Sequence, residues 1–304
     1  MNTSTTHAGS TVGATAGLTG GLTRRQLLAG VPVEDRTLSM AGVATSLLVG
    51  GAGPPMVLLH GPGEFAGTWV PVLGELVETH RVIAPDLPGH GATETPDAVD
   101  AAWVDRWLDE LIAQTCSEPP VLVGRVVGGA IAARFAAEHP GSVSQVILVD
   151  STGLVPFEPD PRFGLALHRF VADPTHASFE RAMDFCAFDL DGVRSRLGDR
   201  WEPYSRYAVE LLRTPRVQGA MGSFIDMYAT VISPDVLDRI DVPTTLIWGR
   251  QDLATPLGAA EAASQRYGWP LHVIENAGDD PPLDQPEAFV QALRTALSRL
   301  GAVS

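Results

Sequence analysis

The sequence predicts an α/β fold, doubly wound around a mostly parallel sheet. Short apolar runs recur along the chain, helix-period stretches separate them, and one long interval interrupts the alternation. A short run that is apolar on both faces is typical of a strand covered by helices on both sides. Regular alternation of such strands with helices indicates a parallel, doubly wound sheet.

The first regular element is a predicted β-hairpin. Residues Arg36–Met40 and Ala44–Val49 are expected to form its strands, with a turn at Ala41 and Gly42. Six further strands are expected, at Met56–Leu59, Arg81–Ala84, Val121–Val123, Val146–Val149, Thr245–Trp248 and His272–Ile274. Helices are expected at about 69–79, 100–115, 127–138, 257–266 and 286–299. The hairpin and the later strands together predict an eight-stranded sheet.

The interval between Asp150 and Thr244 shows helical periodicity and no clear strand. It is rich in aromatic residues, which we expect to form mainly a small core of their own. A helical insertion at the carboxyl edge of such a sheet also roofs the crevice in which ligands bind. We therefore divide the chain into a core at 21–152 and 233–304 and a helical cap at 153–232. Residues 1–20, rich in Gly, Ser, Thr and Ala, are predicted to be a disordered tail.

The charge of the chain excludes some classes of partner. A formal net charge of -15 argues against nucleic acid and against an anionic membrane, because phosphate binding needs clustered basic residues. With two cysteines no disulfide framework is implied, so a reducing compartment, the cytoplasm, is expected. The expected partner is a small molecule, and the oligomeric state is left open.

Residues Thr23–Leu28 superficially look like a twin-arginine export signal. The segment that follows contains Glu34, Asp35 and Arg36, where an export signal needs an apolar run. We interpret 23–28 as a short surface helix.

Four motifs together resemble the landmarks of the α/β-hydrolase superfamily in order and spacing. They are Leu58–Gly61, Ala84–Gly91, Val123–Gly129 and Trp248–Asp252. The resemblance covers about residues 33–300, and it implies the eight-stranded hydrolase sheet with the insertion as a cap. Within that superfamily, the chain resembles the members that carry a helical cap over the sheet.

The resemblance fails at the catalytic triad. In the family, a Gly-x-Ser-x-Gly turn lifts a nucleophilic serine into the pocket. Here Val126 stands at the serine position, between Gly124 and Gly128, and valine has no nucleophilic atom. The position of the triad acid is matched by Asp252, whereas the position of the histidine is taken by Asp279. A carboxylate does not relay the serine proton as imidazole does.

A third departure concerns the oxyanion hole. The family usually draws one donor from the backbone N–H that follows the His-Gly pair, and that residue is Pro62, which has no N–H. The other donor, the N–H of Val127, is retained. In subtilisin the loss of the serine or the histidine alone costs about 10⁶ in kcat. We therefore expect no serine-esterase activity. Epoxide hydrolases and haloalkane dehalogenases, relatives that carry an aspartate at the elbow, are also a poor match, because that position is Val126.

Carboxyl groups are the chemistry that remains. The resemblance implies that Asp252 and Asp279 face each other, and ionising both would be costly, so one pKa should rise. Such a pair can act as general acid and base near neutral pH. Asp280 could substitute for either, which makes these three residues the predicted catalytic set.

The predicted substrate-binding set surrounds these carboxyls. It comprises Pro62, Glu64, Phe65, Trp69, Arg125, Val126 and Val127. For Arg125 we weigh a role in the pocket against a buried ion pair, with Asp86 as one candidate partner. No phosphate-binding loop, metal-ligand cluster or flavin motif stands out, so no cofactor and no metal are expected.

Three functions follow from this site. The first is a cofactor-independent, non-hydrolytic enzyme, of cyclase, isomerase or lyase type, that uses carboxyl groups on a small, largely apolar metabolite of natural-product biosynthesis. The second is a ligand-binding pseudoenzyme without turnover. The third is an atypical hydrolase, with an Asp-activated water or Ser151 as nucleophile. The fold alone does not choose among them.

Overall fold

The computed structural model describes residues 21–298, so the predicted tail at 1–20 lies outside the described part of the chain. Eight strands form one sheet, as expected. They are β1 Glu34–Met40, β2 Val43–Gly50, β3 Pro55–Leu59, β4 Arg81–Pro85, β5 Val121–Arg125, β6 Gln145–Val149, β7 Thr244–Gly249 and β8 Leu271–Ile274.

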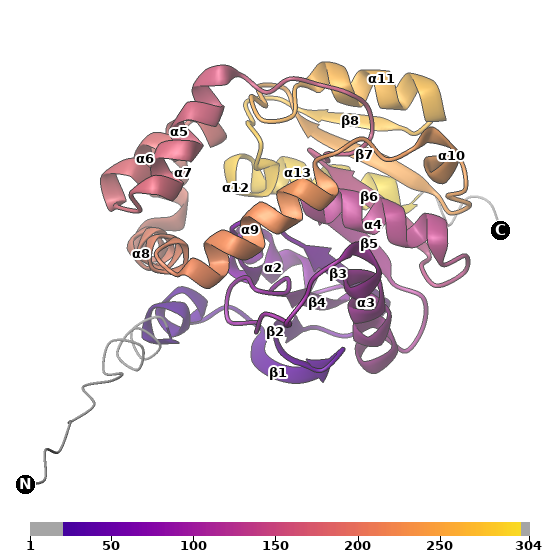
Figure 1. The fold of residues 1–304 in the computed structure, drawn as a ribbon, viewed down its shortest axis with the longest axis horizontal. Helices are drawn as coiled ribbons and strands as arrows, with labels where there is room; N and C mark the ends of the chain where they lie inside the picture. The colour runs from indigo at the N-terminus through magenta and orange to yellow at the C-terminus, as the bar shows by residue number, and fades with distance from the viewer. Residues whose placement is uncertain (1–20, 299–304) are drawn as a thin grey trace, which may run out of the picture.

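The strand order is β1-β2-β4-β3-β5-β6-β7-β8 (Figure 1). Strand β2 runs antiparallel to β1 and β4, and the strands from β4 to β8 are parallel to their neighbours. The hairpin turns at Ala41 and Gly42, both with positive φ (47° and 83°), as the tight turns that suit twisted strands require. The fold class predicted from the sequence is confirmed.

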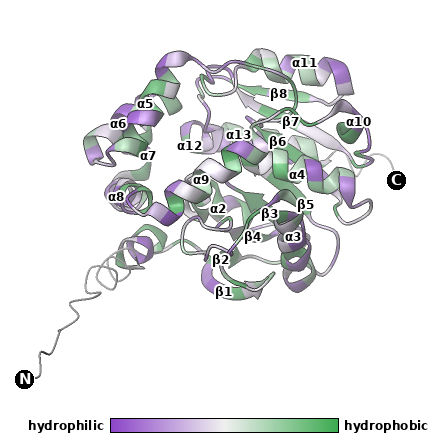
Figure 2. Ribbon diagram, viewed as in Figure 1, coloured by the Kyte–Doolittle hydropathy of each residue, from purple (hydrophilic) through white to green (hydrophobic). Residues whose placement is uncertain are grey.

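Helices cover both faces of the sheet. The helices of the core are η1 Ala66–Trp69, α2 Val70–Leu76, α3 Ala101–Thr115, α4 Val127–Glu138, α10 Pro234–Leu237, α11 Leu257–Tyr267, α12 Pro281–Asp284 and α13 Pro286–Ser298. Side chains alternate between two core clusters along each strand: in β3, Met56 and Leu58 join one cluster, and Val57 and Leu59 join the other. Figure 2 shows the central strands as mainly hydrophobic, whereas the helices contain both hydrophobic and hydrophilic residues.

The interval between β6 and β7 contains no strand and supplies a helical layer at the left of the view in Figure 1. Before α10, its helices are α5 Pro161–Ala172, α6 His176–Cys186, α7 Leu190–Leu197, η2 Gly198–Arg200, α8 Trp201–Leu212 and α9 Pro215–Tyr228. Ring contacts such as Phe170 with Phe179, at 5.4 Å between centroids, give this layer an aromatic core.

The segment at 21–28 is helical and lies at the surface, as predicted, with Leu22, Arg25 and Gln26 exposed, but its other face is buried. Leu27 is completely buried and Arg24 is 5% exposed. Leu27 belongs to the core cluster that also contains Phe65, and the guanidinium of Arg24 bonds three side chains of the core. The helix is therefore an integral part of the packed fold.

Candidate functional site

The turn between β5 and α4 keeps the geometry of a nucleophile elbow. Val126 has φ 51° and ψ −116°, a conformation that is a genuine outlier for a β-branched residue. Close packing explains why the flanking glycines are needed: a Cβ on Gly128 would lie 2.4 Å from the carbonyl oxygen of Leu59. Strain of about 1–3 kcal/mol persists only where the surrounding structure over-determines it. The elbow backbone is therefore maintained without a nucleophile.

The loop after β3, which in the family supplies one oxyanion donor, carries Pro62 at the donor position. Pro62 lines a cavity under the cap, and the neighbouring Gly61 N–H donates to Glu64 Oε2 at 2.9 Å. His60 has a structural role: its Nε2 accepts from the N–H of Leu87 at 2.9 Å, and burial lowers its pKa. Val127, at the first position of α4, is 1% exposed.

Arg125 lies at the centre of the site. Its side chain is 2% exposed and forms an ion pair with Glu64, while Nη2 lies 3.5 Å from Asp280 Oδ2. The Nη1 group donates to the backbone carbonyl of Asp279 at 2.8 Å. Arg125 therefore forms a buried ion pair, one of the two alternatives weighed, but not with the candidate partner Asp86, which accepts from Arg24 at 2.9 Å. Arg125 thus links the loop before η1 to the loop after β8.

The loop after β8 carries the two predicted aspartates. Asp279 is 8% and Asp280 is 5% exposed. Burial raises the pKa of Asp280 to about 8, although Arg125 opposes the rise. Burial also raises the pKa of Asp279 well above its usual range, with Arg125 opposing and Asp252 reinforcing the effect. Burial therefore favours the protonated form of both carboxyls.

Asp252 follows β7 and is fixed by the backbone. Its Oδ1 accepts from the N–H groups of Ala254 and Thr255 at 2.7 and 2.9 Å, and its side chain also interacts with that of Asp150. Burial raises the pKa of Asp252 to about 7. The charge of Asp252 contributes to the raised pKa of Asp279, and the facing arrangement of these two carboxyls stays a prediction.

A further carboxyl group, Asp150, was missed by sequence reasoning. It follows β6, is fully buried, and accepts from the N–H of Gly249 at 2.9 Å through Oδ1. Burial first, and the charge of Asp252 second, raise its pKa well above the usual range. Adjacent parallel strands end at the same edge of a sheet, so an aspartate directly after β6 was the signal that could have found it.

Asp284 joins the core to the cap and was also missed. It is 1% exposed, and its Oδ2 accepts from the N–H of Gly278 at 2.7 Å and from that of Phe188 at 3.0 Å. The N–H of Asp279 donates to the carbonyl of Cys186 at 3.0 Å. The end of α6 therefore lies directly on the loop that carries Asp279.

A cavity of about 100 Å³ lies between the core and the cap. It is lined by Pro62, Gly63, Glu64, Phe65, Thr68, Leu167, Phe170, Phe179, Ala182, Met183, Cys186, Tyr204, Ala208, Leu212 and Met221. Among these described lining residues, Glu64 alone carries a formal charge. An apolar cavity of about 150 Å³ is large enough for benzene. The cavity therefore suits only a very small apolar group unless the cap moves.

The predicted site residues divide into two groups. Pro62, Glu64 and Phe65 line the cavity, whereas Arg125, Val126, Val127, Asp252, Asp279 and Asp280 are outside its lining. Trp69 lies in the core against Phe289, 6.2 Å away between ring centroids, and does not line the cavity either. Ser151, considered as an alternative nucleophile, is 1% exposed and donates to the carbonyl of Thr152.

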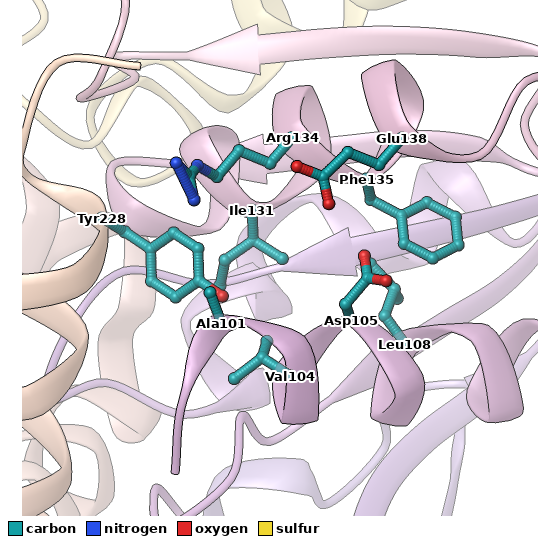
Figure 3. Close-up of a pocket in the computed structure, with 9 residues that line it drawn as sticks. All are labelled: Ala101, Val104, Asp105, Leu108, Ile131, Arg134, Phe135, Glu138 and Tyr228. Carbon is teal, nitrogen blue, oxygen red and sulfur yellow. The ribbon is translucent and has the colours of Figure 1, made fainter. Parts of the chain in front are cut away.

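A second hollow lies between α3 and α4, with Tyr228 of α9 at one end (Figure 3). Its volume of about 20 Å³ leaves room for roughly one water molecule. The cavity under the cap is therefore the better candidate for a small-molecule site. Within residues 21–298, no cluster of His, Cys, Asp and Glu has the arrangement of a metal site, and no helix is long and apolar enough to span a membrane.

Comparison with known proteins identifies the family. A model of the α/β hydrolase family matches residues 56–292, and the chain belongs to that family. It is 30% identical over 261 residues to a pimeloyl-acyl-carrier-protein methyl ester esterase of Chromobacterium violaceum, covering 80% of this chain and 94% of the relative. It is 29% identical to a 2-hydroxymuconate semialdehyde hydrolase of a Pseudomonas species, covering 90% of this chain and 97% of the relative.

Solved structures give the same fold. The carboxylesterase CesB of Bacillus subtilis has a TM-score of 0.79 at 20% identity, covering 93% of this chain and 98% of its own. The 2-hydroxy-6-oxo-6-phenylhexa-2,4-dienoate hydrolase of a Rhodococcus species has a TM-score of 0.76 at 25% identity, covering 87% and 98%. These relatives bear the names of hydrolytic enzymes, which supports an enzyme here and gives no support for cyclase or lyase chemistry.

Proposed function

We propose that this member of the α/β-hydrolase family is a cofactor-independent enzyme that uses carboxyl groups for acid–base catalysis, without a covalent intermediate, on a small and largely apolar molecule. The observation that carries the proposal is the group of five carboxyls around one buried guanidinium, beside an elbow that has no nucleophile. The carboxyls are Glu64, Asp150, Asp252, Asp279 and Asp280.

Glu64 is the group that meets the substrate. It is the one charged residue among those lining the cavity, and 26% of its side chain is exposed. Its Oε1 contacts Arg125 and its Oε2 accepts from the N–H of Gly61, so the carboxylate has a fixed direction. A carboxylate held in this way can take a proton from one atom of a bound molecule and return it to another.

The buried aspartates act behind Glu64. Burial raises the pKa of Asp280 to about 8, and Asp280 shares Arg125 with Glu64. In its neutral form Asp280 does not repel the Glu64 carboxylate. Asp252 and Asp279 have raised pKa values for the same reason, burial. In this role the aspartates position and tune Glu64 without touching the substrate. Isomerisation, cyclisation or elimination needs only such proton transfers.

Hydrolysis by an activated water is the second candidate, and the names of the relatives favour it. Here Glu64 would remove a proton from water, the resulting hydroxide would attack a carbonyl carbon, and the proton would pass to the leaving group. The same residues serve both reactions, so product analysis must separate them.

Metabolite profiling in H₂¹⁸O provides the test. The purified protein is incubated with a small-molecule extract of the cells that make it, and products are compared with those of Glu64→Gln and of the exposed control Arg250→Gln. Isobaric products or products lighter by a leaving group, lost in Glu64→Gln and kept in Arg250→Gln, support the proposal. Products that gain one ¹⁸O-labelled water support hydrolysis. A co-purifying ligand that is bound but never converted contradicts both and indicates a pseudoenzyme.

A further inference from the structure

The helix at residues 21–28 lies outside the region matched by the family model, yet it contacts both the core and the cap. In Figure 1 it is the indigo helix beside α8. It is bonded to the cap on two sides: Thr23 Oγ1 lies 3.4 Å from Glu210 Oε1 of α8, and Arg200 Nη2 donates to the carbonyl of Ala29 at 2.9 Å.

The core side of this junction depends on Arg24. Its Nε and Nη2 bond the two carboxylate oxygens of Asp35 at 2.8 and 3.1 Å, and Nη2 also lies 3.1 Å from Ser46 Oγ. Its Nη1 donates to Asp86 Oδ2 at 2.9 Å. A guanidinium presents several donors in a fixed fork, so a single arginine can hold three separate side chains.

Asp86 connects Arg24 to the residues at the floor of the cavity. Its Oδ1 accepts from the N–H of Ala66 at 2.6 Å, directly after the two lining residues Glu64 and Phe65. A Cβ on Gly91 would lie 2.2 Å from the Asp86 carboxyl, so the space around that carboxyl is full. The position of Ala66, and with it the lining residues before it, therefore depends on the Arg24–Asp86 pair.

The roof of the cavity is held by the same helix. Tyr207 of α8 packs edge-on against Phe65, with 4.7 Å between ring centroids, and its hydroxyl interacts with Arg24. Leu27 lies close to Gly67, where a Cβ would be 2.9 Å from a Leu27 methyl group. The neighbouring helix residue Arg25 is exposed and supplies a matched control within the same turn.

We infer that Arg24 is a positioning residue for the cavity: it fixes the Glu64–Phe65 floor through Asp86 and holds cap helix α8 closed over it. The role does not depend on which reaction the cavity supports. Because the cavity is small, a larger ligand needs a movement of the cap to bind, and the Arg24 junction sets how often that happens.

Thiol labelling tests this inference on the full-length protein. The chain has two cysteines, of which Cys186 lines the cavity and Cys116 lies at the end of α3. Both side chains are only partly exposed and burial raises the pKa of both thiols, so each should react slowly, and faster when its surroundings open. Methyl methanethiosulfonate is the probe, and peptide mass spectrometry reads the two labelling rates separately.

Arg24→Gln is expected to accelerate labelling of Cys186 at least about tenfold through local opening, with the rate at Cys116 unchanged. Arg25→Gln should change neither rate. Tyr207→Phe, which removes only the hydroxyl and keeps the ring on Phe65, should give a smaller increase at Cys186 and serves if Arg24→Gln does not fold. Equal rates in wild type and both variants would overturn the inference. So would a parallel rise at both cysteines, because that pattern indicates general destabilisation.

Discussion

Two loops at the carboxyl edge of the sheet have diverged in opposite ways. At the elbow, Val126 retains the strained backbone of a nucleophile turn but presents no reactive atom. The loop after β8 instead carries three buried carboxyls, those of Asp279, Asp280 and Asp284. The first loop thus has a strained backbone and an apolar side chain, whereas the second holds a cluster of ionisable groups. Backbone strain and buried ionisable groups therefore lie in different loops of this site.

The largest expected effect comes from removing the cation that both loops share. Arg125→Met removes the ion pair with the partly exposed Glu64 and leaves the buried carbonyl of Asp279 without its donor, so the free energy of unfolding is expected to fall by about 2–4 kcal/mol. Chemical denaturation measures it. Arg250→Met, at an exposed pair with Glu275, is the control and should cost less than about 1 kcal/mol. If the two variants prove equally stable, Arg125 is not the centre of the site.

The elbow itself provides the next test. Gly128→Ala places a Cβ 2.4 Å from one backbone oxygen and 2.7 Å from another, so it should destabilise the protein by about 2–3 kcal/mol. Gly74→Ala, in α2 with nothing within 4 Å of the new Cβ, should instead stabilise it by about 0.5–1 kcal/mol. A neutral Gly128→Ala would mean that the elbow backbone is not constrained by its packing.

The last test concerns the pH dependence of stability. Asp280 has a folded pKa of about 8 against an ordinary value of 3.8, so the folded state binds the proton more tightly. Its stabilising contribution is complete below about pH 4 and is lost as the pH rises towards 8. Asp280→Asn cannot ionise, so between pH 5 and 8 its unfolding free energy should fall less steeply with pH than that of wild type. Identical slopes would show that Asp280 is ionised in the folded protein.

The fold was predictable because its signals are local and repeated. Each strand is a short apolar run and each helix a periodic stretch, so the eight strands and their order of appearance followed from pattern alone. The hydrolase motifs also predicted the elbow at Val126. The ends of elements differ by up to three residues, as at the end of α2, because the last hydrogen bonds of an element are weak.

The site was predictable only in part. The identities at Val126, Asp252 and Asp279 were readable from the motifs, whereas the partner of Arg125 was not, because an ion pair joins residues far apart in the chain. The burial of Arg24 was missed for the same reason: an arginine in a short polar segment is usually exposed, and only tertiary contacts with Asp35, Ser46 and Asp86 reverse that preference.

The central claim is that acyl-enzyme chemistry is absent from this site. A fluorophosphonate probe, which labels an activated serine, tests it most directly, with Val126→Ser combined with Asp279→His as a variant designed to restore the triad positions. We expect no stoichiometric labelling of the wild type, and labelling at position 126 in that variant, because the elbow backbone is that of a nucleophile turn. Stoichiometric labelling of any serine in the wild-type protein would contradict it.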